Sequence, residues 1–182
     1  MGLTRGRKKK SCKDFRLRKT ALPMATFEDI LRAYGSALAR VAASYEADRA
    51  LREDLLQEML IAIHVALPTL RDDTRLAPFV FRIAHNRGVT HVVRERRLRR
   101  APPLDDQARR PATPEDEVLI DEETRRLQHA VRCLPVPYRQ VITLTLEGLS
   151  HAEIAEALGL SVSNVAVRVN RAKSKLQEIL NA

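Results

Sequence analysis

Cysteine is scarce in this chain, which holds only Cys12 and Cys133, far apart in the sequence. There is no Cys-x-x-Cys pair and no histidine cluster, so neither a disulfide framework nor a zinc site is expected, and no metal or cofactor is predicted. No apolar run approaches the length of a membrane span, and no hydrophobic signal core follows the basic N-terminus. These absences favour a reducing, cytoplasmic setting away from the membrane.

Strand signals are also few. Ala, Leu, Arg and Glu dominate the 182 residues, of which 45% are hydrophobic. This composition predicts an all-α protein with one moderate core or two small ones. No nucleophile paired with a base, no phosphate-binding loop and no metal cluster is visible, so we expect no enzymatic activity.

The positive charge lies mostly at one end of the chain. Residues 1–22 contain nine Lys or Arg and one Asp, which is +8 of the total of +9. The rest is nearly neutral and acts through local patches rather than a global field. The basic tail, expected to be disordered, has two interpretations: a segment attracted to phosphates, or residues that precede a true start at Met24. We favour the second.

Residues 148–180 have the pattern of a helix-turn-helix. Ser150 and Glu153 can form a capping box for a helix over 151–158. Gly159 tolerates a positive φ, and Ser161 can cap a second helix. That helix has an apolar stripe predicted to be buried, formed by Val162, Val165, Val169, Ala172, Leu176 and Ile179.

The opposite face of this helix carries amides, guanidinium groups and two small apolar side chains. Amides pair with adenine, and guanidinium groups pair with guanine or with phosphate. A plain helical hairpin with a solvated outer face is the alternative, but the compact capping pattern favours DNA binding. The residues of this face are Asn164, Ala166, Val167, Arg168, Asn170, Arg171 and Lys173.

Three further helices are predicted before a linker, over residues 26–46, 50–67 and 75–98. On the second, Asp54, Gln57 and Glu58 fall at i, i+3 and i+4, so they share one polar patch, which alone reads as a solvated face. The third becomes increasingly basic toward its end, which suits a nucleic-acid backbone. Its arginines are Arg82, Arg87, Arg94, Arg96, Arg97, Arg99 and Arg100.

The apolar periodicity stops between the two halves, where three prolines appear. We therefore expect two small helical domains joined by a flexible linker, with the helix-turn-helix in the C-terminal one. Thr113, Pro114 and Asp116 are predicted to start that domain's first helix. The predicted segments are a basic tail over 1–22, a first domain over 23–100, the linker over 101–113 and a second domain over 114–182.

Sequence motifs in both halves resemble a known family. They are DLLQE at 54–58, FVFRIAHN at 79–86, LPVPYRQVI at 134–142, EGLSHAEIAEALGLS at 147–161 and VRVNRAKSKL at 167–176. Together they are similar to a bacterial RNA polymerase sigma factor of the extracytoplasmic-function (ECF) group, over about residues 26–100 and 115–180. Such proteins keep regions 2 and 4 of larger sigma factors.

The resemblance implies a protein that binds core RNA polymerase and directs promoter recognition and strand opening. Asp54, Gln57 and Glu58 would dock on the clamp coiled coil of the largest subunit, and the second domain would contact the flap. An anti-sigma factor is a further candidate partner. Melted minus-ten DNA would meet Leu70, Arg71, Asp73, Arg82, Asn86, Arg87, Arg94 and Arg97. Duplex minus-thirty-five DNA would meet Ser163, Asn164, Ala166, Val167, Arg168, Asn170 and Arg171.

Three features depart from the family pattern. Leu70 stands where relatives often have an aromatic residue, which weakens base stacking. Ala166 and Val167 replace polar residues, so they can pack on thymine methyl groups but cannot donate hydrogen bonds. The helix before Glu147 is one residue shorter than the spacing to GLS that is usual in the family.

The alternative function is a stand-alone helix-turn-helix regulator that binds duplex DNA. Such a regulator would not need the DLLQE patch or the basic third helix. An RNA-processing enzyme is remote, since the chain lacks catalytic residues.

Overall fold

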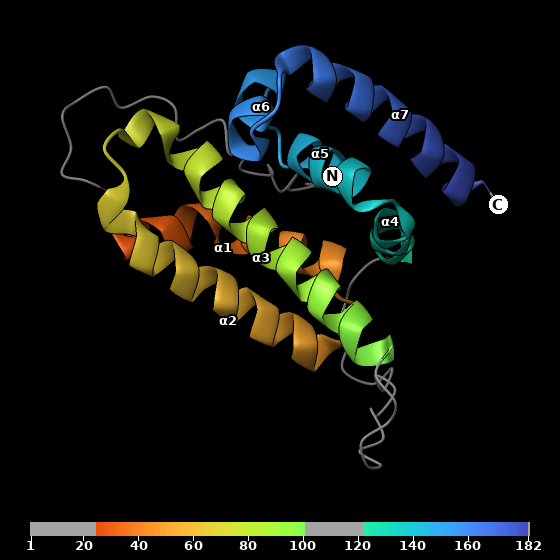
Figure 1. The fold of residues 1–182 in the computed structure, drawn as a ribbon, viewed down its shortest axis with the longest axis horizontal. Coiled ribbons are helices and arrows are strands. Elements are labelled where there is room, and N and C mark those ends of the chain that lie inside the picture. Colours follow the sequence, from red (N-terminus) through yellow and green to blue (C-terminus); the bar gives the residue numbers. More distant parts are fainter. Residues whose placement is uncertain (1–24, 101–121, 182) are drawn as a thin grey trace, which may run out of the picture.

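The described part of the chain is all helical. The computed structural model describes residues 25–100 and 122–181, and every regular element in these ranges is a helix (Figure 1). The α-helices are α1 (Phe27–Tyr45), α2 (Arg49–Ala66), α3 (Leu76–Arg100), α4 (Glu122–Cys133), α5 (Val136–Leu146), α6 (His151–Leu158) and α7 (Val162–Leu180), with short 3₁₀ turns η2 (Leu67–Thr69) and η3 (Asp73–Arg75). None of these helices is long and apolar enough to cross a membrane. The all-α prediction is confirmed.

Helices α1, α2 and α3 form what we call the N-terminal module. Figure 1 shows α2 and α3 side by side and antiparallel, joined by the segment that contains η2 and η3. The predicted start of α1 is confirmed, because Thr26 and Asp29 form a capping box. The core of the module is fully buried, and its largest side chains are Ile30, Leu38, Leu55, Met59, Ile63 and Phe81.

Helices α4 to α7 form the C-terminal module. Helix α7 packs on α4, α5 and α6 and lies far from α2 in Figure 1. Its buried side chains are Val165, Val169, Ala172 and Leu176, which confirms most of the predicted stripe. Val162 was predicted to be buried, but it is 51% exposed. It occupies the first helical position of α7.

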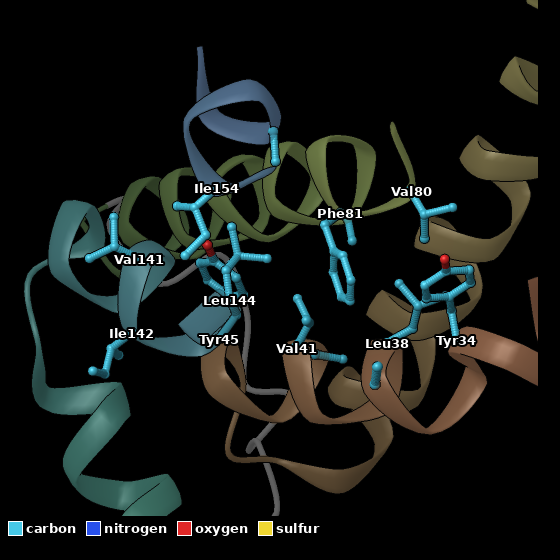
Figure 2. Packing of buried hydrophobic residues seen from close by; sticks show 14 of the residues in the cluster. Tyr34, Leu38, Val41, Tyr45, Val80, Phe81, Val141, Ile142, Leu144 and Ile154 are labelled. Atoms are coloured by element: carbon cyan, nitrogen blue, oxygen red, sulfur yellow. The ribbon is translucent and has the colours of Figure 1, made fainter. Parts of the chain in front are cut away.

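The two modules are docked on one another. Buried residues of α1, α3, α5 and α6 belong to one continuous cluster, in which Ile154 and Leu144 lie beside Tyr45 (Figure 2). Arg132 of α4 also donates a hydrogen bond of 3.1 Å to the carbonyl oxygen of Ala43 in α1. The sequence predicted two helical domains, and the structure adds that they share an apolar interface.

Some predicted boundaries shift in the structure. The third helix begins at Leu76 after a 3₁₀ turn, in which Thr74 donates to the Asp72 carboxylate, and it continues to Arg100. Leu67, predicted to end the second helix, belongs instead to the 3₁₀ turn that follows α2. The tail over 1–22, the linker over 101–113 and the helix start at Thr113 lie outside the described residues.

Candidate nucleic-acid interface

The polar patch on α2 lies on an exposed face. Asp54 and Gln57 are exposed, and the Glu58 side chain is 41% exposed. Arg94 of α3 donates a hydrogen bond of 3.1 Å from Nη1 to Oε1 of Glu58. A residue predicted to contact the polymerase therefore touches a residue predicted to contact minus-ten DNA.

This exposed face of α2 continues into apolar residues that sequence reasoning missed. Ile61 and Val65 are 64% and 71% exposed, and they follow Glu58 at i+3 and i+7. They lie at i+7 and i+11 from Asp54, on the same helical face, so helical periodicity could have predicted their position. The patch is thus polar at its N-terminal end and apolar at its C-terminal end.

The segment between α2 and α3 has exposed charged residues, whereas Leu70 in it is buried. Arg71 and Asp73 are exposed, whereas Leu70 is only 7% exposed and belongs to the core. Hydrogen bonds from the side chain and backbone of Thr74 hold the pKa of the Asp72 carboxyl below its usual value. In this conformation Leu70 offers no surface to a base, which differs from its predicted place at the minus-ten strand.

The predicted DNA-binding residues of α3 are exposed, but the side chains of Arg82 and Arg94 are already hydrogen bonded. Asn86, Arg87 and Arg97 lie on the surface. Arg82 donates from Nη2 to the backbone carbonyl of Glu156 in α6, at 2.7 Å. Arg75 forms an ion pair with the Glu156 side chain. The first helix of the helix-turn-helix therefore covers the start of α3 when the modules are docked.

Buried polar groups fix α3 against α1. His85 is fully buried, and its Nδ1 lies 2.8 Å from the Tyr45 hydroxyl. Burial lowers the pKa of His85 to about 3, so the ring is neutral, and burial raises the pKa of Tyr45. The Arg139 guanidinium lies 5.5 Å from the centre of the Tyr45 ring, and burial lowers the pKa of that guanidinium. Tyr45 thereby connects both modules.

A second buried pair joins α3 to Glu46, the C-cap residue of α1. His91 Nε2 lies 2.7 Å from Oε2 of Glu46. Burial acts to raise the pKa of Glu46, but hydrogen bonds from His91 and from the backbone N–H groups of Asp48 and Ala47 outweigh it, so the pKa is lowered. These polar contacts set the register of α3, and with it the direction of its exposed arginines.

The helix-turn-helix has the local geometry that its sequence predicted. Ser150 and Glu153 form a capping box at the start of α6. Gly159 has a φ of 67°, a left-handed conformation that favours glycine. Ser161 caps α7 by accepting a hydrogen bond of 3.2 Å from the backbone N–H of Asn164. The turn is therefore fixed by local hydrogen bonds, and it directs α7 away from α6.

The predicted reading face of α7 points to solvent while the modules are docked. Ser163, Asn164, Asn170 and Arg171 are exposed, and Val167 is 49% exposed. Ala166 and Arg168 are half-buried at the two edges of this face. All seven residues predicted to meet minus-thirty-five DNA thus lie on one helix, with the four polar exposed ones around Val167.

Comparison with known proteins gives two ordered matches. Sigma-70 region 2 matches residues 30–98, and Sigma-70, region 4 matches residues 124–176. RNA polymerase sigma factor SigZ of Bacillus subtilis is 32% identical over 73% of this chain and 74% of its own length. RNA polymerase sigma factor CnrH of Cupriavidus metallidurans is 32% identical over 86% of this chain and 87% of its own.

Solved structures give the same assignment. CnrH in complex with the cytosolic domain of CnrY has a TM-score of 0.63 and 28% identity, and it covers 85% of this chain and 87% of its own. The sigma factor RpoE of Bartonella quintana, in complex with the anti-sigma factor NepR, has a TM-score of 0.65 over 86% of this chain and 97% of its own. Its identity is 23%, so it supports the fold.

The fold and the two matches define a transcription initiation factor built from two helical modules. More particularly, the chain belongs to the RNA polymerase sigma factors of the ECF group. It binds core RNA polymerase and promoter DNA and directs transcription initiation. A stand-alone helix-turn-helix regulator is not favoured, because it would not carry region 2.

Proposed function

We propose that this sigma factor docks on core polymerase through Asp54, Gln57 and Glu58 of α2. The two carboxylates and the amide lie on one exposed helical face, where basic partner groups can reach them. Carboxylate to arginine contacts that lose water on binding are strong and directional. The clamp coiled coil of the largest subunit is the proposed partner for this patch, and the flap is the proposed partner for the C-terminal module.

The proposed minus-ten surface is formed by the exposed residues Arg71 and Asp73 together with α3. Its exposed arginines would hold the phosphates of the melted strand, while Asn86 is placed to meet a base edge. Arg82 can join them only after its hydrogen bond to Glu156 breaks. Arg94 must likewise be shared with Glu58. Binding of DNA by the whole of this surface therefore requires that α6 separates from α3.

The proposed minus-thirty-five reader is α7, which enters the major groove of duplex DNA with the N-terminal half of its exposed face. Arg171 and the two asparagines supply donors and acceptors for phosphates and base edges. Because the face is open in the docked chain, this contact does not require the modules to separate.

Simultaneous binding of both promoter elements does require separation. The two elements are named for positions 25 base pairs apart, which is about 85 Å of duplex at 3.4 Å per base pair. The longest described helix, α3 with 25 residues, spans about 38 Å. Because this distance is more than twice the length of α3, we propose that the modules separate and that the chain is extended on the promoter.

We further propose that the protein has no catalytic role and that an anti-sigma factor regulates it. No group of three or more His, Cys, Asp or Glu that could hold a metal occurs among residues 25–100 and 122–181. The relative RpoE was solved with an anti-sigma factor, and CnrH was solved with the cytosolic domain of CnrY. A partner that stabilises the docked arrangement would keep Arg82 from DNA.

The experiment that tests the main proposal adds the full chain to sigma-free core polymerase and measures specific transcripts. Glu58→Lys reverses one charge of the patch and should lower polymerase affinity about 30-fold or more. Glu53→Lys, the same charge change at an exposed position of α2, is the matched control. Normal polymerase affinity of the Glu58→Lys chain would contradict the role of the patch. A silent polymerase with the wild-type chain would contradict the function.

A further inference from the structure

An isopropyl group lies at the centre of the reading face of α7. Val167 is 49% exposed although it is apolar, and it is on the side of the helix opposite the buried stripe. Its neighbours at i−4, i−3, i+3 and i+4 are Ser163, Asn164, Asn170 and Arg171, all exposed. Residues at these spacings adjoin one another on a helix surface. Val167 is therefore an apolar contact point surrounded by hydrogen-bonding side chains.

We propose that Val167 is a specificity-determining residue, and that it selects the C5-methyl group of a thymine in the major groove of the minus-thirty-five element. This inference rests on the proposed role of α7 as the duplex reader. It specifies the base, thymine, and the chemical group, a methyl group, that the centre of the reading face prefers. The surrounding polar residues hold the phosphates and adjacent base edges, and they fix where the valine meets the groove.

The chemistry of the major groove favours this assignment. Thymine is the only unmodified base that presents a methyl group there; cytosine has only a hydrogen at C5, and the purines present acceptors or donors at N7 and at position 6. A valine facing a donor or an acceptor removes water from it and returns no hydrogen bond, which disfavours binding. A valine facing a methyl group buries apolar surface on both sides. Removal of one buried methyl group should weaken binding about fourfold.

The position of Val167 fits DNA better than a protein core. It lies in the second turn of α7, and in helix-turn-helix proteins the N-terminal residues of the second helix contact base edges. A docking surface for another apolar face would need more apolar area than this. Asn170 and Arg171 directly follow it, and both carry groups that match base edges and phosphates.

The test uses the holoenzyme of the full chain with core polymerase. A minus-thirty-five element is first selected from a randomised duplex library by the wild-type holoenzyme. Each thymine of the selected element is then replaced in turn by deoxyuridine, which lacks only the C5-methyl group. The duplexes are made without methylated cytosine, so thymine supplies every C5-methyl group. Affinity is measured for the wild type, Val167→Ala and Ser174→Ala, the last an exposed residue farther along the same face.

We expect one position at which deoxyuridine weakens wild-type binding about fourfold. At that position Val167→Ala should bind the thymine and deoxyuridine duplexes equally, while Ser174→Ala should keep the fourfold difference. Because Val167 is exposed, its replacement leaves the core intact, and an unchanged melting temperature checks this.

Three results would overturn the inference. They are equal wild-type affinity for every thymine and deoxyuridine pair, a fourfold difference that persists in Val167→Ala, and a loss of polymerase assembly rather than of base selectivity in that variant. The last result would place a protein partner on Val167. Failure of the proposed function itself looks different, because then the wild-type holoenzyme selects no element and makes no specific transcript.

Discussion

Arg40 and Glu147 form a bidentate ion pair across the boundary between the two modules. Nε of Arg40 donates to Oε1 of Glu147 at 2.8 Å, and Nη2 donates to Oε2 at 2.6 Å. The Glu147 side chain is 5% exposed and that of Arg40 is 53% exposed. A planar guanidinium that meets both oxygens of a carboxylate gives directional as well as electrostatic stabilisation. This pair therefore helps to hold the docked arrangement through two directional, charge-assisted hydrogen bonds.

Arg40→Ala should loosen that arrangement. The change leaves the Glu147 carboxylate nearly buried without its bidentate partner, which costs about 1 to 3 kcal/mol of docking free energy. Small-angle X-ray scattering should show a larger radius of gyration for the variant than for the wild type. Arg32→Ala removes only an exposed ion pair within α1, with Asp29, and should leave the radius unchanged. Identical radii for all three chains would refute this role of the pair.

Gly88→Ala should destabilise the fold. A Cβ atom at residue 88 would lie 2.4 Å from two ring carbons of Tyr45. The ring cannot shift freely, because His85 hydrogen bonds to its hydroxyl and Arg139 lies over its face. We expect a loss of about 1 to 3 kcal/mol, measured by urea unfolding monitored with circular dichroism.

A matched glycine gives the opposite expectation. Gly35 lies inside α1, and a Cβ atom there would meet nothing within 4 Å. Gly35→Ala should therefore stabilise the chain by about 0.5 to 1 kcal/mol, through the better helix propensity of alanine. A Gly88→Ala chain as stable as Gly35→Ala would show that α3 and Tyr45 are not in contact.

Acid should weaken the fold through His85. Its pKa is lowered from 6.5 to about 3 in the folded chain by burial, so the unfolded chain binds a proton first as the pH falls. The stability contributed by the neutral ring is present above pH 6.5 and is lost progressively toward pH 3. Between pH 7 and pH 5 the loss is about 2 kcal/mol. Urea unfolding at the two pH values measures it.

His85→Gln provides the comparison for that pH dependence. Carboxyl groups with lowered pKa values, such as Glu46 and Asp72, also destabilise the fold on acidification, but they titrate at lower pH. Over the range from pH 7 to pH 5 the variant should therefore lose less stability than the wild type. Nuclear magnetic resonance should show a neutral His85 ring at pH 5, and a titration midpoint near 6.5 would contradict its burial.

Local hydrogen-bond chemistry made the helix-turn-helix predictable from sequence. Ser150, Glu153, Gly159 and Ser161 each act within a few residues of their own position, so the capping box and the left-handed turn could be inferred without tertiary information. Apolar periodicity likewise predicted most of the buried stripe of α7. It failed at Val162, which lies at the start of the helix and is 51% exposed.

Burial of polar side chains and docking of the modules could not be inferred in this way. His85 is fully buried with its Nδ1 hydrogen bonded to the Tyr45 hydroxyl, and apolar patterns contain no information on such pairs. Arg40 and Glu147 are 107 residues apart in the sequence, and each alone looks like an ordinary surface charge. The roles proposed for individual DNA-binding residues stay predictions.

Mutations of the donor and of the acceptor residue should affect the hydrogen bond from Arg82 to α6 differently. Its acceptor is the main-chain carbonyl of Glu156, not a side chain. Any residue type at position 156 supplies the same carbonyl, so mutations in α6 can abolish the Arg75 ion pair but leave this acceptor in place. Of the two residues in contact, only Arg82 can lose the hydrogen bond through a change of side chain, and the same change removes a proposed phosphate ligand. A substitution at Arg82 therefore affects both the docking of the modules and the binding of promoter DNA. Mutations that release the docked modules and leave DNA binding intact should fall elsewhere in the interface.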